Sequence, residues 1–185
     1  MNCKSGRLGM NISQCPDCGH LEFHNNSCRN RNCPNCQVVN KEVWVDKRRA
    51  EVIDTPYFHV VFTLPHELNP LVYCNQQLLY ALLHRCCAQT LLELSSNEKW
   101  LGATPGIIQV LHTWDQEMGY HVHMHCIISG GGLTADQKIK KSKSTFFIPV
   151  GVLRDKFKGK YLAELDSLYK GHRLTFSSSC EKLKN

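Results

Sequence analysis

Long apolar runs are missing from this sequence. None of its segments approaches the roughly 18 consecutive apolar residues of a transmembrane helix, and its first residues lack the apolar stretch of a secretory signal. It also contains no internal repeat, and its one low-complexity stretch is the short lysine-serine run at residues 138–144. We therefore expect no membrane partner and a cytoplasmic location.

Cysteine, in contrast, is abundant, with eleven residues in the chain. An odd count without a secretory signal argues against a disulfide framework. Two C-P-x-C knuckles lie at residues 15–18 and 33–36, and two tight turns that each present a pair of thiolates are typical of a structural zinc site. We predict that the ligands of one zinc ion are Cys15, Cys18, Cys33 and Cys36.

The loop between the knuckles contains further candidate zinc ligands, namely His20, His24 and Cys28. The remaining cysteines are expected to be reduced thiols that pack as small hydrophobes. They are Cys3, Cys74, Cys86, Cys87, Cys126 and Cys180.

Histidines alternate with apolar residues within residues 120–129. Successive side chains of a strand point to opposite faces, so His121, His123 and His125 would project from one face. The other face would enter an apolar core with Val122, Met124 and Cys126, and the isoleucines at 127 and 128 would extend the buried run. Neutral imidazoles on a rigid strand can hold a divalent cation and leave positions open for a phosphate. The alternative is a half-buried strand whose histidines bond to water and neighbours.

The rest of the pattern predicts an α+β fold. Residues 57–64, 107–114 and 146–153 have the composition of strands, and the second of these would form a hairpin with the histidine strand, which the glycines at 130–132 would end. Leucines recur at helical spacing within residues 71–94, and basic helices are predicted at 41–51 and 154–169. An antiparallel sheet with helices on one face suits this order.

Charge is distributed unevenly along the chain. Residues 1–50 carry a net charge of +4, residues 51–136 carry −6 and residues 137–185 carry +8. Basic segments of this kind are typical of proteins that bind a polyanion, and a solvated surface is the alternative for the lysine run. The predicted DNA-binding residues are Arg29, Arg31, Lys47, Arg48, Arg49, Lys156, Lys158 and Lys160.

Several separated motifs follow one another in the chain. They are the residues 26–37 with the second knuckle, the run Phe-Thr-Leu-Pro-His-Glu-Leu-Asn-Pro at 62–70, the triplet His-Thr-Trp at 112–114, and His123-x-His125 followed by Gly-Gly-Gly-Leu at 130–133. In this order they resemble the rolling-circle transposases of the insertion-sequence ninety-one group. Those proteins are HUH nucleases, named for two histidines that flank a hydrophobic residue.

The resemblance implies a zinc-binding domain followed by a ferredoxin-like nuclease core that nicks one DNA strand. His123 and His125 would hold Mg²⁺ or Mn²⁺, and Gln116 or Glu117 is a candidate third ligand. In the family a tyrosine attacks the scissile phosphate and becomes linked to the 5′ phosphate. The implied partner is DNA, as single strand or as hairpin transposon ends.

The resemblance also implies that this chain is shortened, because members of the family are about twice its length and carry a Y-x-x-x-Y pair further along. Tyr161 and Tyr169 are eight residues apart instead of one helical turn, so no catalytic tyrosine is assigned. The expected organisation is a zinc module at 1–40, a basic linker helix at 41–56, an incomplete nuclease core at 57–176 and a tail at 177–185.

Whether the chain is itself an enzyme is therefore left open by its sequence. The first interpretation is a transposase, or its remnant, built for strand nicking and transesterification. The second is a non-catalytic zinc-dependent DNA-binding protein or regulator derived from a transposase. A third is a metallohydrolase that uses a metal-bound water.

Overall fold

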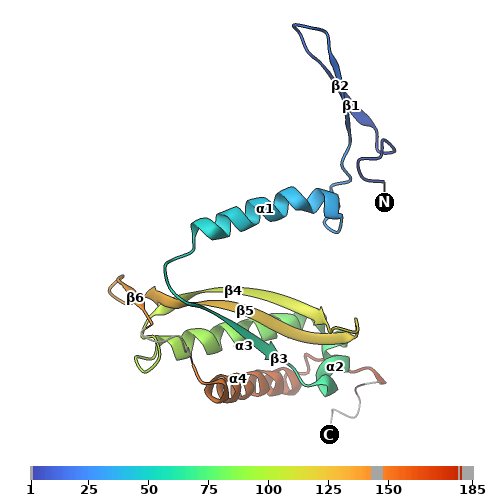
Figure 1. Ribbon diagram of the computed structural model, residues 1–185. Coiled ribbons are helices and arrows are strands. Elements are labelled where there is room, and N and C mark those ends of the chain that lie inside the picture. Colours follow the sequence, from blue (N-terminus) through green and yellow to red (C-terminus); the bar gives the residue numbers. More distant parts are fainter. Residues whose placement is uncertain (1, 143–147, 179, 181–185) are drawn as a thin grey trace. The chain divides into compact units, whose positions relative to one another are not determined.

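A computed structural model describes residues 2–142, 148–178 and 180 of the chain (Figure 1). The chain divides into two compact units, residues 1–52 and residues 53–185. Among the described residues, no helix is long and apolar enough to cross a membrane.

The first unit consists of a hairpin and one helix. Strands β1 (Met10–Gln14) and β2 (Leu21–Asn25) pair antiparallel, and every residue of both strands is exposed. Helix α1 (Pro34–Ala50) begins seven residues earlier than the helix predicted at 41–51, and it starts inside the second knuckle. Pro34 favours this start, because proline lacks the N–H that the first helical position leaves unpaired.

The second unit is built on an antiparallel sheet. Its strands are β3 (Tyr57–Thr63), β4 (Thr104–Trp114), β5 (Tyr120–Leu133) and β6 (Ile139–Lys141). The order is β3-β5-β4, and β6 pairs with the end of β5. The long β5 is thus the central strand, as expected for an alternating stretch that buries one of its faces.

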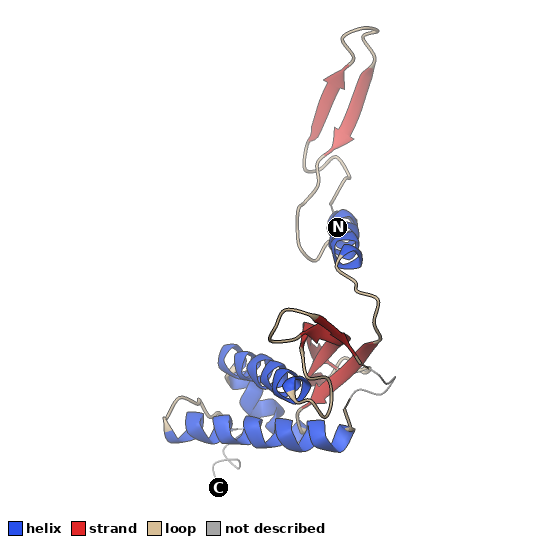
Figure 2. Ribbon diagram, turned by 90° about the vertical axis from the view of Figure 1, so that its left-hand side faces the viewer, coloured by secondary structure: helices blue, strands red, loops and turns tan. Residues whose placement is uncertain are grey.

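Helices cover one face of this sheet. They are α2 (Asn69–Cys74), which follows the short 3-10 helix η1 (His66–Leu68), α3 (Gln76–Ser96) and α4 (Val150–Lys170). Figure 2 shows these helices of the second unit gathered on one side of its strands. The sequence predicted one helix over residues 71–94, but Asn75 interrupts it. The Asn75 side-chain amide donates to the carbonyl oxygens of Leu71 and Thr175, both at 2.8 Å.

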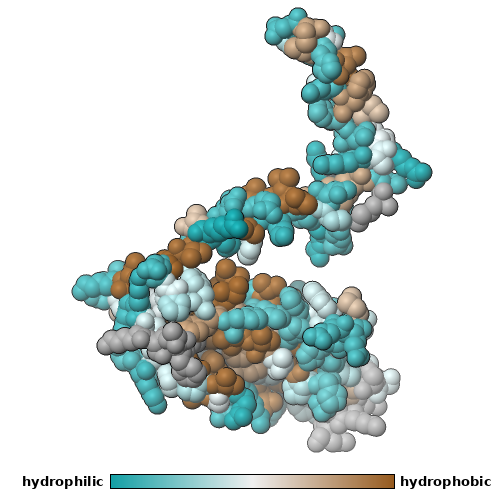
Figure 3. Space-filling view, in the orientation of Figure 1, coloured by the Kyte–Doolittle hydropathy of each residue, from teal (hydrophilic) through white to brown (hydrophobic). Residues whose placement is uncertain are grey.

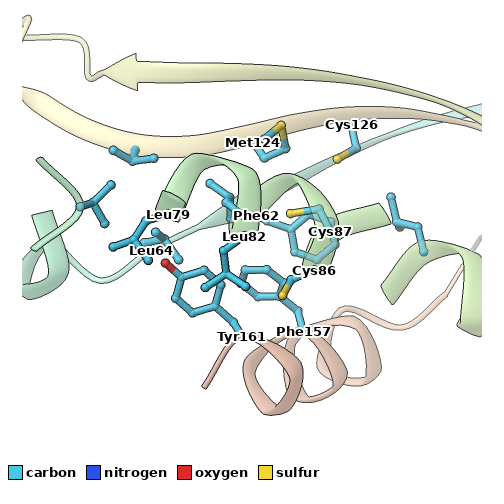
Figure 4. Packing of buried hydrophobic residues seen from close by; sticks show 14 of the residues in the cluster. Phe62, Leu64, Leu79, Leu82, Cys86, Cys87, Met124, Cys126, Phe157 and Tyr161 are labelled. Atoms are coloured by element: carbon cyan, nitrogen blue, oxygen red, sulfur yellow. The ribbon is translucent and has the colours of Figure 1, made fainter. Parts of the chain in front are cut away.

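The core lies between the sheet and α3 and α4. Val122, Met124 and Cys126 are fully buried, which confirms the predicted face of β5. Figure 4 shows Met124 and Cys126 directed from β5 toward the residues of α3 and α4. The rings of Phe62 and Phe157 meet here at a centroid distance of 4.8 Å. The predicted α+β architecture, an antiparallel sheet with packed helices, is therefore confirmed.

Three local predictions were wrong. Ile127 is 47% exposed, because the period of two places it on the histidine face while Ile128 is buried. The glycines do not end β5, which continues to Leu133. A Cβ atom on Gly132 would collide with the carbonyl of Thr104 on β4, so glycine permits this close strand contact.

The third concerns the strand predicted at 146–153. Its last four residues form the first turn of α4, where Val152 and Leu153 donate backbone N–H groups to the carbonyl of Pro149. Phe146 lies outside the described residues. Pro149 at the N-cap position favours this helix start. The apolar composition of the segment had instead indicated a strand.

Candidate metal centres

Four cysteines of the first unit bring their sulfur atoms together. The Sγ atoms of Cys3, Cys28, Cys33 and Cys36 all lie within 4.8 Å of one another. The Sγ of Cys36 is 3.4 Å from that of Cys3 and 3.7 Å from that of Cys28. Tetrahedral zinc with bonds of about 2.3 Å places its sulfur ligands about 3.8 Å apart. The group therefore fits a structural zinc ion.

Backbone geometry prepares these thiols for a cation. The backbone N–H of Cys28 donates to the Cys3 Sγ at 3.4 Å, and that of Asn30 donates to the Cys28 Sγ at 3.5 Å. Cys33 is the N-cap residue of α1, and the N–H of Cys36 lowers the pKa of its thiol to about 7. A low thiol pKa favours the thiolate, which is the form that binds metal. The Cys36 thiol raises the pKa of Cys3 and burial raises that of Cys28, so a cation would have to displace protons from these two thiols.

The structure brings together only two of the four cysteines that were predicted as zinc ligands. Cys33 and Cys36 belong to the cluster, as does the further candidate Cys28, but Cys15 and Cys18 lie in the turn between β1 and β2. Cys3, which the sequence assigned to apolar packing, completes the group. The reason is the hairpin, which places its turn at one end and its two flanking segments together at the other.

The candidate ligands His20 and His24 are also outside the cluster. His24 is on β2, where its Nε2 lies 3.2 Å from a carboxylate oxygen of Glu22, and His20 is in the exposed segment after the knuckle. The signal for Cys3 was the alternating pattern of residues 10–14 and 21–25 around a tight Cys-Pro-Asp-Cys-Gly turn.

Histidines of three neighbouring strands gather on the outer face of the sheet. His112 of β4 pairs with His123 of β5 in the strand register, and their ligand nitrogens and one of His125 lie within 4.8 Å of one another. His59 of β3 adds a fourth ring, with its Nε2 2.8 Å from the His125 Nδ1. His121 lies beside His123 at a centroid distance of 5.2 Å but is not one of the three grouped ligands.

The three grouped histidines are half-buried, and for His125 this burial affects the charge. Burial lowers the pKa of His125, and the neighbouring His112, His123 and His59 lower it further. A lower pKa keeps the imidazole neutral at physiological pH, with a lone pair free for a cation. With the rings of His112 and His123 close to it on the sheet, His125 forms an arrangement that suits a metal ion.

Gln116 and Glu117 were the candidates for a third ligand, and both lie in the exposed turn after β4. Asp115 orders this turn, since its carboxylate accepts the backbone N–H groups of Glu117 at 3.0 Å and Gly119 at 2.7 Å. His112 supplies the third ring instead. The sequence contained this residue in a motif, but only the pairing of β4 with β5 brings it opposite His123.

Several of the predicted DNA-binding cations are engaged within the protein. Lys156 and Lys160 on α4 both pair with the carboxylate of Glu93 on α3. In the first unit Arg48 pairs with Glu51 at 2.6 Å, and Arg49 with Asp46 at 3.6 Å. The other predicted cations are exposed, and they are Arg29, Arg31, Lys47 and Lys158.

The two tyrosines of α4 lie on the helix-covered side of the sheet. Tyr161 is 3% exposed, and its hydroxyl has no hydrogen-bond partner among the described residues. Its pKa is raised by burial, which disfavours the phenolate. Tyr169 packs its ring edge-on against Phe176. Helix α4 therefore directs Tyr161 into the core, away from the histidine face.

Comparisons with known proteins identify two family models along the chain. Residues 1–64 match the family described as a transposase zinc-binding domain, and residues 106–185 match the family described as a putative transposase. The putative transposase y4qJ of Sinorhizobium fredii (strain NBRC 101917 / NGR234) is 41% identical over 98% of this chain and 46% of its own length. The transposase for insertion sequence element IS801 of Pseudomonas savastanoi pv. phaseolicola is 33% identical over 71% of this chain and 32% of its own. The chain thus spans less than half the length of these curated relatives.

Among solved structures, the chain is similar to the conjugative relaxase TrwC. In a complex with a 27-mer DNA that comprises the recognition hairpin and the cleavage site, TrwC matches 60% of this chain and 44% of its own, with 17% identity and a TM-score of 0.46. A copper-bound TrwC complex with oriT DNA matches 65% of this chain and 47% of its own, with 20% identity and a TM-score of 0.45.

Proposed function

This chain belongs to the insertion-sequence ninety-one group of transposases, and on that premise we propose that its histidine cluster is the metal site for nicking single-stranded DNA. The observation that carries the proposal is the convergence of His112, His123 and His125 on the face of the sheet opposite helices α3 and α4. A cation held there is accessible to a polyanion, whereas one in the core would not be.

Two hydrogen bonds orient the proposed ligands. The Nδ1 of His125 lies 2.8 Å from the His59 Nε2, and the Nδ1 of His123 lies 3.2 Å from the backbone carbonyl oxygen of His121. With Nδ1 occupied in both rings, Nε2 remains for a cation. His59 is thus a positioning residue, because a partner on the second nitrogen fixes the orientation and tautomer of a ligand imidazole.

The composition of the site bears on the choice of cation. Mg²⁺ prefers oxygen ligands in an octahedral arrangement, whereas Mn²⁺ is the first and weakest binder of the transition-metal series, whose later members bind imidazole well. Of the two cations that the sequence suggested, the three histidines favour Mn²⁺. A bound divalent cation supplies Lewis-acid polarisation of the scissile phosphate and helps to orient it.

The attacking group is a separate matter from the metal site. Tyr161 is buried with its hydroxyl in the core, and Tyr169 is on the same helix. A metal site without an aligned nucleophile lacks the positioning contribution to catalysis. We therefore propose that residues 1–185 alone bind Mn²⁺ and DNA but form no covalent tyrosine adduct.

Metal binding tests the site directly. Titration of the full chain with Mn²⁺ should give a micromolar-scale or weaker dissociation constant, since three imidazoles leave half of an octahedral shell to water. The double variant His123→Ala/His125→Ala should lose this binding and keep its fold. His66→Ala is the matched control, because His66 is an exposed histidine outside the cluster. Equal binding by all three proteins would refute the site.

DNA binding and strand transfer form the second test. Single-stranded or hairpin DNA should bind more tightly than plain duplex, and the affinity should fall steeply with salt as counterions are released. Incubation with Mn²⁺ and labelled single-stranded DNA, followed by denaturation, should show no covalent band. A band that disappears in a Tyr169→Phe variant would replace this proposal with that of a complete nicking enzyme.

A DNA-binding protein without catalytic activity is the second candidate function. The observation that favours it is the inward orientation of Tyr161 together with the exposed cations of the first unit, Arg29, Arg31 and Lys47. The two candidates differ in Mn²⁺ binding. A chain that binds DNA equally well with and without the histidines, and that does not bind Mn²⁺, would be such a regulator.

A further inference from the structure

The first knuckle remains unused after the four-cysteine cluster is assigned. Cys15 and Cys18 sit in the turn of the hairpin, where Gly19 donates its N–H to the Cys15 carbonyl at 3.0 Å and Cys15 donates to the His20 carbonyl at 2.9 Å. The backbone N–H groups of Cys18 and Asp17 point at the Cys15 sulfur and lower the pKa of its thiol. This local geometry resembles half of a zinc site.

The knuckle cannot join the cluster at the other end of the hairpin. Five paired positions, from Gln14↔Leu21 to Met10↔Asn25, separate the two ends. At about 3.3 Å per residue they span roughly 16 Å. Within the described part of the chain, the only grouped sets of three or more His, Cys, Asp or Glu ligands are the four cysteines and the three histidines. The knuckle therefore supplies two of the four ligands that tetrahedral zinc needs.

The hairpin also has an apolar face that none of the described residues of its own unit covers. Direct pairing of Ile12 with Phe23, and of Gln14 with Leu21, puts these side chains on the face that also holds Met10. Their exposed fractions are 49% for Met10, 60% for Ile12, 46% for Leu21 and 61% for Phe23. Figure 3 shows apolar atoms along one side of the hairpin. An isolated two-stranded hairpin is marginally stable in water, so we expect this apolar face to pack against another protein surface.

We propose that this apolar face packs against the same face of a second copy of this chain, and that Cys15 and Cys18 of both copies bind one shared zinc ion between the hairpin tips. A two-fold axis along the hairpins brings both apolar faces into contact and both knuckles to the same end. Such a contact is isologous, since each copy offers the same surface to the other. Four thiolates from two knuckles then complete a tetrahedral site.

Charge on the hairpin is compatible with self-association. The apolar face carries Gln14 and Asn25 as its polar members and no charged residue, whereas Glu22 lies on the opposite face. Two copies can therefore approach without like-charge repulsion across the contact. The apolar area of two short strands is small for a stable dimer, so the shared metal would provide much of the affinity.

The test measures oligomeric state and zinc content of the full chain together. The wild type should be a dimer in light scattering coupled to gel filtration. The double variant Cys15→Ser/Cys18→Ser should be a monomer that has lost about half a zinc ion per chain, because one tetrahedral site serves two copies. Its remaining zinc reports that the four-cysteine cluster is still folded. Cys74→Ser is the matched control, a half-buried thiol of the second unit, and should remain a zinc-replete dimer.

A second variant probes the apolar face with the cysteines intact. Ile12→Ser/Phe23→Ser should raise the dimer dissociation constant at least about tenfold, the loss that removal of a modest apolar contact produces. A monomeric wild type would overturn the proposal. So would a loss of one whole zinc ion per chain in the Cys15→Ser/Cys18→Ser variant, because the knuckle would then complete its site within one copy. The variant His123→Ala/His125→Ala should leave the dimer and its zinc content unchanged, so this outcome is separable from that of the proposed nicking site.

Discussion

Among the described residues, the buried apolar side chains of residues 1–52 are two cysteines, Cys3 and Cys33, whereas residues 53–185 bury a continuous cluster of leucines, aromatics and thiols. Both units contain a candidate metal site. In the first unit, two of the four clustered cysteines hold the buried positions that apolar side chains fill in the second. The comparison suggests that a bound metal stabilises the fold of the first unit, whereas in the second unit an apolar core stabilises the fold, and the fold positions the metal ligands.

Removal of zinc is the largest expected perturbation, and it should affect the first unit alone. Binding of structural zinc contributes about 10–16 kcal/mol to the folding of small zinc modules. Chelation, or the variant Cys33→Ser, should therefore unfold β1, β2 and α1 while the sheet of the second unit keeps its structure. Amide hydrogen exchange measures both units in one sample.

The control for this experiment is Cys87→Ala, which removes a fully buried thiol from the second unit. It should lower the stability of that unit and leave the zinc content unchanged. Slow exchange in α1 after chelation would show that the first unit has another source of stability, and the comparison would fail.

A cavity in the core is the next largest perturbation, and it should destabilise the second unit while the first unit keeps its structure. Leu83 of α3 is fully buried within the core cluster, so Leu83→Ala should destabilise the second unit by about 2–5 kcal/mol. Denaturant unfolding followed by tryptophan fluorescence gives the change, and zinc content should not vary. Leu162→Ala is the matched control, because Leu162 is 49% exposed on α4. A similar loss in both variants would indicate that the core is not where stability resides.

The sequence predicted the second unit better than the first, for a physical reason. Alternation along β5 reports directly which side chains enter the core, so Val122, Met124 and Cys126 could be assigned from the period of two alone. Applied to the end of the strand, the same period would also have predicted that the side chain of Ile127 is exposed. The period of two cannot show which residues of other strands join a site. His112 and His59 reach the histidine cluster only through the register of β4 and β3 with β5.

The zinc ligands of the first unit show the same limit more strongly. Knuckle spacing identified Cys33 and Cys36, but it could not say which other thiols meet them. That depends on a hairpin whose strands have no buried face to mark them. The alternating pattern of residues 10–14 and 21–25 around a tight turn is the only mark of this hairpin in the sequence, and the strand register then decides which flanking segments meet.

A smaller effect is expected from His59, which touches the proposed metal ligands without being one of the three grouped histidines. His59→Ala should weaken Mn²⁺ binding by about 10–100-fold, the usual cost of losing a partner that orients a ligand histidine. Thermal stability should be nearly unchanged, because His59 is exposed on β3. His59→Gln, which can still form a hydrogen bond to the His125 Nδ1, should recover part of the affinity. Equal losses in both variants would argue that His59 binds the cation itself.

The smallest expected effect is a dependence of the second unit's stability on pH in the absence of metal. Because the pKa of His125 is lowered in the folded protein, the unfolded chain binds more protons once the pH falls below the ordinary histidine value of about 6.5. Stability from this residue should therefore be level above that pH and fall as the pH decreases toward the lowered folded pKa. Denaturant unfolding of the metal-free chain at several pH values between about 7 and 5 measures the slope of the free energy of unfolding against pH.

The variant His125→Gln should flatten this slope, whereas His66→Gln should preserve it, since His66 lies outside the cluster. An unchanged slope in His125→Gln would mean that the outer face of the sheet does not discriminate against charge, and that the neutral imidazole required of a preformed metal site is not enforced by the fold.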